Sequence, residues 1–268
     1  MTDLDHCLSF AEQSAREIGD QLHEVFQEGR ISGELKEDHT LVTAADHQAD
    51  QIFQSALAQT FPEHGLLSEE SSTIYPPGKD LVWVIDPLDG TTNFSQGLHH
   101  WGVSIAFLEK GVPRAAALYF PVVGEMYTAA DQQGSCLNGQ LLQPDDHLKA
   151  SSLSFFLHCS RTHQRFQVDV PYKSRTLGSA AYNLCAVAKG TGLMGLETTV
   201  KLWDIAGAWL VLQEARCAVD IAQGESAVPA GPGIDYNKHI YTVMAAQDET
   251  YLQQLARSLK PRTKPKEG

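Results

Sequence analysis

The spacing of apolar residues predicts a long helix near the start of the chain and a second helix soon after it. From Leu4 to Phe26 apolar residues recur every three or four positions, which is the period of one helical face, and Gly29 follows as a stop signal. The second helix is expected from about Ala45 to Thr60, where Phe61-Pro62 closes it. The polar segment 34–39 between the two helices is expected to form a turn or loop.

Apolar runs of strand length dominate the middle of the chain. Leu81 to Ile85 is continuously apolar, which is typical of a strand buried on both faces. Turn signals of the hairpin type follow at Lys110-Gly111, at 121–124 and at Asn138-Gly139. Three further strands are predicted in this region, at Gly102 to Leu108, Ala115 to Phe120 and Glu125 to Ala130.

The second half of the chain mixes helix and strand patterns. Helices are expected at Ser179 to Lys189, at about Asp204 to Glu214 and near the C-terminus. Strands are expected at Ser154 to His158, Val168 to Val170, Cys217 to Ile221 and Tyr241 to Ala245. Antiparallel meanders with inserted helices, and no separating linker, indicate an α+β fold in layers around one core. We therefore expect a single domain over residues 1–268.

Composition narrows the class of protein. Of the 268 residues, 43% are hydrophobic and 20% are charged, as in ordinary globular proteins. No apolar stretch approaches the roughly 20 residues of a membrane helix. The N-terminal segment is acidic where an export signal would be basic. Five cysteines without C-x-x-C spacing argue against a disulfide framework and a zinc cluster. A cytoplasmic protein with no membrane partner is expected.

Charge bears on the choice of partner. The formal net charge of −13 argues against a nucleic-acid partner, because a polyanion would be repelled. The same charge is compatible with a phosphorylated substrate if metal ions invert the local field. The basic tail, residues 260–268, is interrupted by prolines and is expected to be disordered.

The strongest candidate for chemistry follows the apolar run that ends at Ile85. Asp86 and Asp89 come directly after this strand, and two carboxylates with the Leu88 carbonyl are hard oxygen donors that suit magnesium better than zinc. Gly90 allows the backbone to approach an anion closely, and Thr91-Thr92 supply donors at an expected helix start. Taken alone, this Asp-Pro-x-Asp-Gly sequence is explained equally well as a plain turn.

Further segments make the pattern more specific. The segment from Trp83 to Phe94, W-V-I-D-P-L-D-G-T-T-N-F, is followed later by Leu202 to Ala208, L-W-D-I-A-G-A. These two segments are similar to the two signatures of the inositol monophosphatase family. Three others fit the family in order, at 42–46, 68–71 and 177–185. The resemblance spans most of the chain and implies a layered α/β/α/β/α sandwich of the inositol monophosphatase and fructose bisphosphatase type.

The resemblance implies a set of oxygen ligands for two or three Mg²⁺ ions. The first ion would be held by Glu69, Asp86 and the Leu88 carbonyl. The second would be held by Asp86, Asp89 and Asp204, and a weaker third by Glu69 and waters. Without the resemblance, Asp204 is explained as a helix N-cap and Glu69-Glu70 as a solvated pair of charges.

The resemblance also assigns roles in catalysis. Thr91, hydrogen-bonded to Asp46, would help Glu69 to orient and deprotonate the attacking water. The backbone amides of Gly90 and Thr91 would hold the oxygens of the phosphate. These roles agree with what phosphate-monoester hydrolysis needs, which is neutralised charge and an oriented nucleophile.

Other positions are implied to contact the leaving group. The helix start at Ser179 and Ala180 would border the substrate. Glu197, by its offset from Asp204, matches a residue of the family that meets polyol hydroxyls. Taken alone, an isolated Glu in a loop is usually just solvated. The segment before Glu197 departs from the family, since Leu193 stands where an Asp is common.

The activity implied is the Mg²⁺-dependent hydrolysis of inositol 1-phosphate, or of a similar polyol or sugar phosphate, by a lithium-sensitive homodimer. Departures at Leu193, His99 and 215–217 leave three alternative substrates open: fructose 1,6-bisphosphate, histidinol phosphate and adenosine bisphosphate. A non-catalytic regulatory protein that keeps the fold is disfavoured, because all four carboxylates of the predicted metal site are present.

Overall fold

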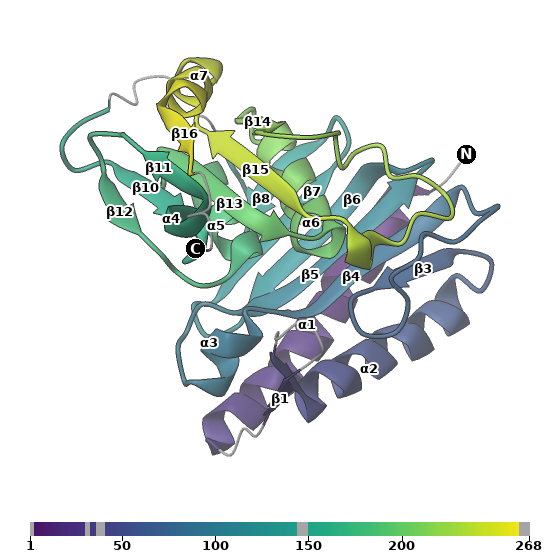
Figure 1. Cartoon of the computed structure of the whole chain (residues 1–268). Coiled ribbons are helices and arrows are strands. Elements are labelled where there is room, and N and C mark those ends of the chain that lie inside the picture. The colour runs from purple at the N-terminus through teal and green to yellow at the C-terminus, as the bar shows by residue number, and fades with distance from the viewer. Residues whose placement is uncertain (1–2, 30–32, 36–40, 144–149, 263–268) are drawn as a thin grey trace, which may run out of the picture.

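Helices form in the two N-terminal segments where the apolar spacing predicts them (Figure 1). The computed structural model describes residues 3–29, 33–35, 41–143 and 150–262. The two helices are α1 (Leu4–Glu28) and α2 (Ala44–Thr60). Asp3 caps α1 by accepting from the N–H of His6 at 3.1 Å, and Thr43 caps α2. Gly29 ends α1 with a φ of 68°, in the left-handed region that favours glycine.

A seven-stranded sheet forms the first β layer, in the order β3-β4-β5-β6-β7-β8-β9. Its strands are β3 (Gly65–Ser68), β4 (Leu81–Asp89), β5 (Gly102–Glu109), β6 (Val112–Phe120), β7 (Glu125–Ala130), β8 (Gly134–Leu137) and β9 (Gln140–Leu141). β3 is parallel to β4, and the other neighbours are antiparallel. In the turns Lys110-Gly111 and Asn138-Gly139, φ is 51° at the first residue and 77° at the second. Tight two-residue hairpin turns of this kind require a positive φ at both positions. The strands predicted here are confirmed.

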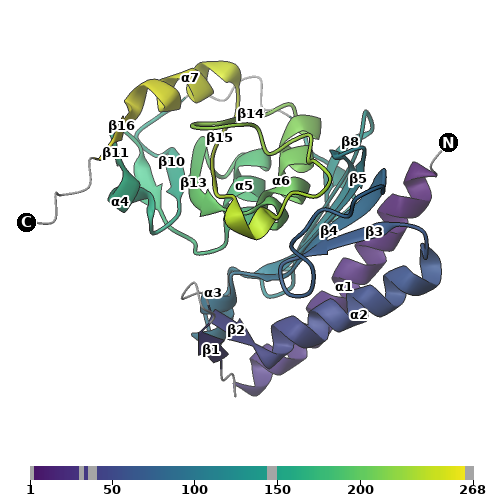
Figure 2. The same ribbon diagram turned by 45° about the vertical axis from the view of Figure 1, so that its right-hand side comes forward.

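A five-stranded sheet, in the order β12-β10-β13-β15-β14, forms the second β layer. Its strands are β10 (Phe155–His158), β12 (Lys173–Arg175), β13 (Met194–Val200), β14 (Ala218–Ile221) and β15 (Tyr241–Ala246). The helices α5 (Ala180–Ala188) and α6 (Leu202–Glu214) lie between the two sheets, and α7 (Glu249–Ser258) covers the outer face of the second one (Figures 1 and 2). Because α1 and α2 cover the first sheet, the layers run α/β/α/β/α. This order confirms the predicted fold class.

Two short pairs of strands, β1 with β2 and β11 with β16, correct two sequence predictions. β1 (Gly33–Leu35) pairs with β2 (Leu41–Thr43), so the first residues of the segment predicted as a loop lie in a strand, and residues 36–39 are outside the described part of the chain. β11 (Phe166–Val168) pairs with β16 (Leu259–Pro261), so this strand lies two residues before the predicted one.

The tail at residues 260–268 was predicted to be disordered, but its first three residues are ordered. Lys260 and Pro261 lie in β16, and the N–H of Arg262 donates to the carbonyl of Arg165 at 2.7 Å. Residues 263–268 are outside the described ranges. The pairing partner of this segment is far away in sequence, and local composition carries no signal for it.

Two apolar cores pack against β4, one on each of its faces. Trp83 and Ile85 belong to the core under α1 and α2, whereas Val82 and Val84 belong to the core between the two sheets. This alternation follows from the period of two residues along a strand, and it explains why the run is apolar throughout. In the first core the ring of Phe10 lies 5.0 Å from the ring of Trp83. The carboxyl end of β4 is thus held rigidly.

Candidate metal centre

A bulge at the end of β4 places the two aspartates of the predicted motif in one cavity. The sequence predicts that the strand ends at Ile85, but β4 continues to Asp89. Asp86 pairs with Ser104 and Asp89 with Gly102, so two residues of β4 face one residue of β5. In a regular strand, residues three apart point to opposite faces. The extra residue re-aims the chain, and both Asp86 and Asp89 line the same cavity.

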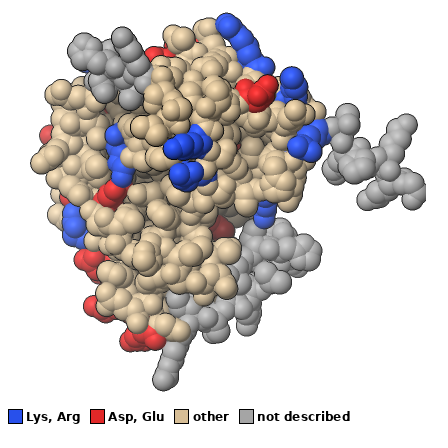
Figure 3. All heavy atoms as spheres, turned by 90° about the vertical axis from the view of Figure 1, so that its left-hand side faces the viewer, with Lys and Arg blue, Asp and Glu red and all other residues tan. Residues whose placement is uncertain are grey.

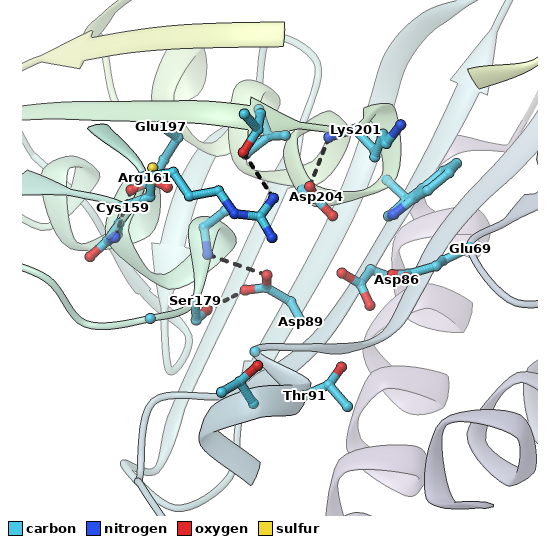
Figure 4. Close-up of a pocket in the computed structure, with 18 of the residues that line it drawn as sticks. Glu69, Asp86, Asp89, Thr91, Cys159, Arg161, Ser179, Glu197, Lys201 and Asp204 are labelled. Atoms are coloured by element: carbon cyan, nitrogen blue, oxygen red, sulfur yellow. Dashed lines mark hydrogen bonds between the residues drawn. The ribbon is translucent and has the colours of Figure 1, made fainter. Parts of the chain in front are cut away.

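Three carboxylates from separate elements converge in this cavity (Figure 4). Glu69 follows β3, Asp86 lies on β4 and Asp204 lies in the first turn of α6, and their oxygens come within 4.8 Å of one another. The N–H of Glu69 donates to the carbonyl of Ile85 at 3.3 Å, which carries Glu69 to the end of β4. The N–H of Lys201 donates to Asp204 Oδ2 at 2.8 Å. We call these three residues the three-carboxylate cluster.

The three-carboxylate cluster has the electrostatics of a cation site. Burial raises the pKa of Asp86 and of Asp204 well above the ordinary value, and neighbouring carboxylates raise both further. A divalent cation would replace this repulsion by attraction and favour the ionised forms. The donors are all carboxylate oxygens, which are the ligands that Mg²⁺ prefers. The residues present therefore fit the predicted metal.

Asp89 lines the same cavity but lies against the N-terminus of α5. The hydroxyl of Ser179 donates to Asp89 Oδ2, the N–H of Ala180 to Oδ1 at 3.2 Å, and the N–H of Ala181 to Oδ2 at 3.1 Å. Burial raises the pKa of Asp89 to about 6, although these hydrogen bonds lower it. Asp89 Oδ1 accepts only one of these hydrogen bonds, so it keeps a second lone pair for a metal ion. The donors predicted to border the substrate, Ser179 and Ala180, thus contact Asp89.

Thr91 and Asp46 form a hydrogen-bonded pair in the structure. Thr91 Oγ1 lies 3.1 Å from Asp46 Oδ1 and 3.0 Å from the carbonyl oxygen of Leu88. Asp46 Oδ2 accepts from the N–H and the hydroxyl of Thr43 at 2.7 and 2.6 Å, in the capping box that starts α2. Burial raises the pKa of Asp46, and the hydrogen bonds from Thr43 oppose this. An ionised Asp46 only accepts, so Thr91 donates to it and keeps lone pairs for another donor.

Gly90 and Asn93 shape the backbone beside this pair. Gly90 has a φ of 89°, and a Cβ there would lie 3.0 Å from the carbonyl oxygen of His100. Asn93 lies in α3 (Thr91–Ser95), and its Nδ2 donates to the carbonyls of His100 at 2.5 Å and Leu177 at 2.7 Å. These bonds tie the motif to the loop before α5. This role of Asn93 has no signal in the local sequence, because Leu177 is 84 positions away.

Glu197 lies on β13 and not in the loop that the sequence predicts. It pairs with Val243 of β15, and only 1% of its surface is exposed. Asn183 Nδ2 donates to Glu197 Oε1 at 2.6 Å. Burial raises the pKa of Glu197 well above the ordinary value, and the nearby Cys159 adds to this. The short run from Met194 to Val200 lacks clear alternation, so local pattern did not identify the strand.

Several further residues line the cavity without having been predicted, among them Cys159, Arg161, Asn183 and Lys201. Burial would raise the pKa of the Cys159 thiol, but hydrogen bonds from Thr162 and Thr198 outweigh it and lower the pKa. Asn183 Oδ1 is buried and has no hydrogen-bond partner in the described part of the chain. Two of these residues lie beside a motif: Lys201 directly precedes the second signature, and Asn183 follows the helix start at Ser179 and Ala180. No motif marks Cys159 or Arg161.

Comparisons with known proteins place the chain in one family. The model of the Inositol monophosphatase family matches residues 3–261. Nus factor SuhB from Pasteurella multocida is 31% identical over 236 residues, which cover 84% of this chain and 88% of the relative. Inositol monophosphatase 1 from Pongo abelii is 31% identical over 78% of this chain and 81% of its own. The crystal structure of the extragenic suppressor protein suhB from Bartonella henselae has a TM-score of 0.78 and 26% identity, covering 92% of this chain and 96% of that chain. The chain therefore belongs to the inositol monophosphatase family.

Proposed function

We propose that the protein is a Mg²⁺-dependent phosphatase acting on a small phosphate monoester of a polyol or sugar, such as inositol 1-phosphate. The three-carboxylate cluster beside the Thr91–Asp46 pair is the observation that carries this proposal. Membership of the family and the relative named inositol monophosphatase 1 support it. Phosphoryl transfer depends mainly on positioning and on charge stabilisation, and the cavity offers groups for both.

The carboxylates would hold two or three Mg²⁺ ions. Glu69, Asp86 and the Leu88 carbonyl would bind one ion, and Asp86, Asp89 and Asp204 a second, with a weaker third on Glu69. When bound, such ions supply an activated water and stabilise charge on the attacking and leaving oxygens. The hydrogen bonds that Asp89 accepts from α5 fix its orientation toward the cavity.

The residues around the cluster position the nucleophile and the phosphate. The hydroxyl of Thr91 donates to Asp46, so its lone pairs accept a hydrogen bond from the attacking water and orient it. Glu69 accepts the proton that this water loses. The N–H groups of Gly90 and Thr91 donate to phosphate oxygens where the short helix α3 begins. On the leaving-group side, Glu197 accepts from hydroxyls of the alcohol, and Asn183 holds it in place.

A phosphate-release assay tests the proposal. Wild-type protein should release phosphate from inositol 1-phosphate with MgCl₂ and not with a chelator. Asp86→Asn should lower the rate by orders of magnitude, because it removes the negative charge of a ligand that two ions would share. Asp80→Asn is the matched control, since Asp80 is exposed just before the same strand. Fructose 1,6-bisphosphate, histidinol phosphate and adenosine bisphosphate complete the screen. Release that is unaffected by chelator or by Asp86→Asn contradicts the proposal.

Several relatives are named Nus factor SuhB and not phosphatase, which favours a second candidate for this chain, a non-catalytic binding role on the same fold. The net charge of −13 predicts that the protein has no nucleic-acid partner, and this stays a prediction for the second candidate as well. A binding role on the outer surface would survive in Asp86→Asn, whereas hydrolysis would not. Pull-down of partners with wild type and Asp86→Asn in parallel separates the two functions.

Assembly and location also stay predictions. We propose a lithium-sensitive homodimer in the cytoplasm. Of the helices in the described ranges, none combines the length and apolar character that crossing a membrane requires. Sedimentation of the purified protein measures the oligomeric state, and phosphate release over a LiCl series measures the sensitivity.

A further inference from the structure

Two basic side chains line the wall of the cavity that holds the acidic residues. Arg161 directly precedes α4 (Thr162–Arg165), and its side chain extends into the cavity (Figure 4). Lys201 directly precedes α6 and lines the same cavity. The two residues come from segments 40 positions apart in sequence, and the second sheet brings them to one wall.

Within the described ranges, neither cation is paired with a carboxylate. Arg161 Nη1 donates to the hydroxyl of Thr199 at 3.4 Å, and Lys201 Nζ donates to the carbonyl of Asn237. A basic residue whose purpose is to neutralise a carboxylate forms an ion pair with it. Arg161 and Lys201 are instead held by neutral oxygens, in a chain with a net charge of −13. This arrangement leaves both positive charges available to an anion that enters with the ligand.

The partner of Arg161 is held in a strained conformation. Thr199 has a φ of 66°, which is rare for a β-branched residue. It lies at an irregularity of β13, where the pairing with β15 shifts between Thr198 and Val200. Strain of this kind gathers at ligand sites, where the surrounding structure imposes it. Here it presents the Thr199 hydroxyl to the cavity, where it contacts Arg161.

The cavity has room for a second charged group beside the three-carboxylate cluster. Its volume is about 1140 Å³, whereas sites for small ligands measure about 300–1000 Å³. The outer surface offers other basic side chains, on β12 and α4 among others, but these face solvent (Figure 3). Arg161 and Lys201 differ from them by lining the cavity that also contains the acidic cluster.

We propose that Arg161 and Lys201 bind a second phosphate group of the substrate, so that the preferred substrate is a bisphosphate of a polyol or sugar. The inference rests on the proposed phosphatase function. The planar guanidinium donates two parallel hydrogen bonds to a phosphate, and the ammonium adds a point charge. In the reaction, the oxygen of water bonds to the phosphorus near the cluster and the bond to the alcohol oxygen breaks. That oxygen takes a proton, and the alcohol leaves with its second phosphate intact.

Fructose 1,6-bisphosphate and fructose 1-phosphate are a matched pair for the test, since they differ only in the second phosphate. Wild type should have a KM at least about tenfold lower for the bisphosphate, as one charge-assisted contact implies. Arg161→Gln should remove most of this preference, and Arg161→Lys should retain part of it. Arg165→Gln is the control, because Arg165 is an exposed arginine next to the same segment and does not line the cavity.

Binding of fructose 6-phosphate gives a readout that does not depend on hydrolysis. Calorimetry should show that Arg161→Gln weakens this binding about tenfold or more, with inorganic phosphate much less affected. Active enzyme in which Arg161→Gln raises KM equally for both substrates overturns the inference and leaves the phosphatase function standing. Loss of fructose 6-phosphate binding in Arg161→Gln, in a protein that hydrolyses neither substrate, supports the second-phosphate site and overturns the phosphatase function.

Discussion

Removing one charge from the three-carboxylate cluster is expected to stabilise the metal-free protein and to abolish its response to Mg²⁺. Asp86→Asn is the sharpest change, because Asp86 is 2% exposed and has Glu69 and Asp204 as neighbours. Asparagine keeps the oxygen that accepts from the N–H of Leu88 at 3.0 Å. The substitution therefore removes charge while it preserves shape and this hydrogen bond.

The distances in the cluster set the size of the effect. The carboxylate oxygens lie within 4.8 Å of one another, and two like charges at that upper limit repel by about 3.5 kcal/mol at an effective dielectric constant of 20. Burial and the neighbouring carboxylates raise the pKa of Asp86, so wild-type protein relieves part of this repulsion by binding a proton. The net gain from Asp86→Asn is then about 1–3 kcal/mol. For a chain of this size, each kcal/mol changes Tm by about 2–4 °C.

The dependence on pH has a definite sign in the metal-free state. The pKa of Asp89 is raised from 3.8 to about 6, so the folded protein binds more protons than the unfolded chain between these values. Stability of metal-free protein therefore falls as pH rises through this window, and it levels off above the folded pKa. Binding of Mg²⁺ has the opposite trend, because it requires ionised carboxylates. Stabilisation by Mg²⁺ should thus be larger at about pH 7.5 than at about pH 5.

Thermal unfolding in chelator and in MgCl₂ at both pH values measures all of these effects. In chelator at the higher pH, Asp86→Asn should melt above wild type, and the gap should narrow at the lower pH. Mg²⁺ should raise the Tm of wild type and of the control Asp80→Asn, but not that of Asp86→Asn. If metal-free Asp86→Asn melts at or below wild type, and both respond equally to Mg²⁺, the cluster is not a cation site.

Three further predictions concern catalysis, specificity and packing. Thr91→Ala should lower kcat by about 10²-fold or more with little change in KM, and Thr91→Ser should restore most of it; an effect on KM alone would mean that Thr91 only binds phosphate. Glu197→Gln should raise KM for inositol 1-phosphate about tenfold more than for glycerol 2-phosphate, and equal effects would assign Glu197 to the support of β13. Phe10→Ala should lower the free energy of unfolding by about 3–5 kcal/mol in urea titrations, and a loss below about 1 kcal/mol would place Phe10 outside the first core.

The sequence predicted the elements that carry strong local patterns. The period of apolar residues located α1 and α2, and the continuous run in β4 was identified as a strand buried on both faces. The same reasoning placed the end of β4 too early, at Ile85. A bulge depends on pairing with β5, and the motif read alone is indistinguishable from a turn. The aspartates were thus identified by type and spacing, while the geometry that aims them required the partner strand.

The placement of residues that act through distant partners could not be predicted. Glu197 is buried because β13 pairs with β15 and because Asn183 reaches it from α5. Arg161 lies before α4, and its guanidinium donates to the hydroxyl of Thr199 on β13, which holds the side chain toward the cavity. None of these contacts leaves a period or a spacing in the chain. A charged residue in a short polar stretch is expected to be solvated, and for Glu197 the fold overrides that expectation by burying β13.

Asp204 shows that a structural role and a ligand role are compatible in one side chain. Read without the resemblance, Asp204 was expected to be the N-cap of α6, and this is wrong: the helix begins two residues earlier, Lys201 is the N-cap, and Asp204 is the third helical residue. Asp204 Oδ2 accepts from the N–H of Lys201, and the positive end of the helix favours the ionised carboxylate. Because one oxygen holds the side chain to its helix, its direction into the cluster is fixed before any cation binds. The hydrogen bond that explains Asp204 without a metal is therefore also what orients it toward one.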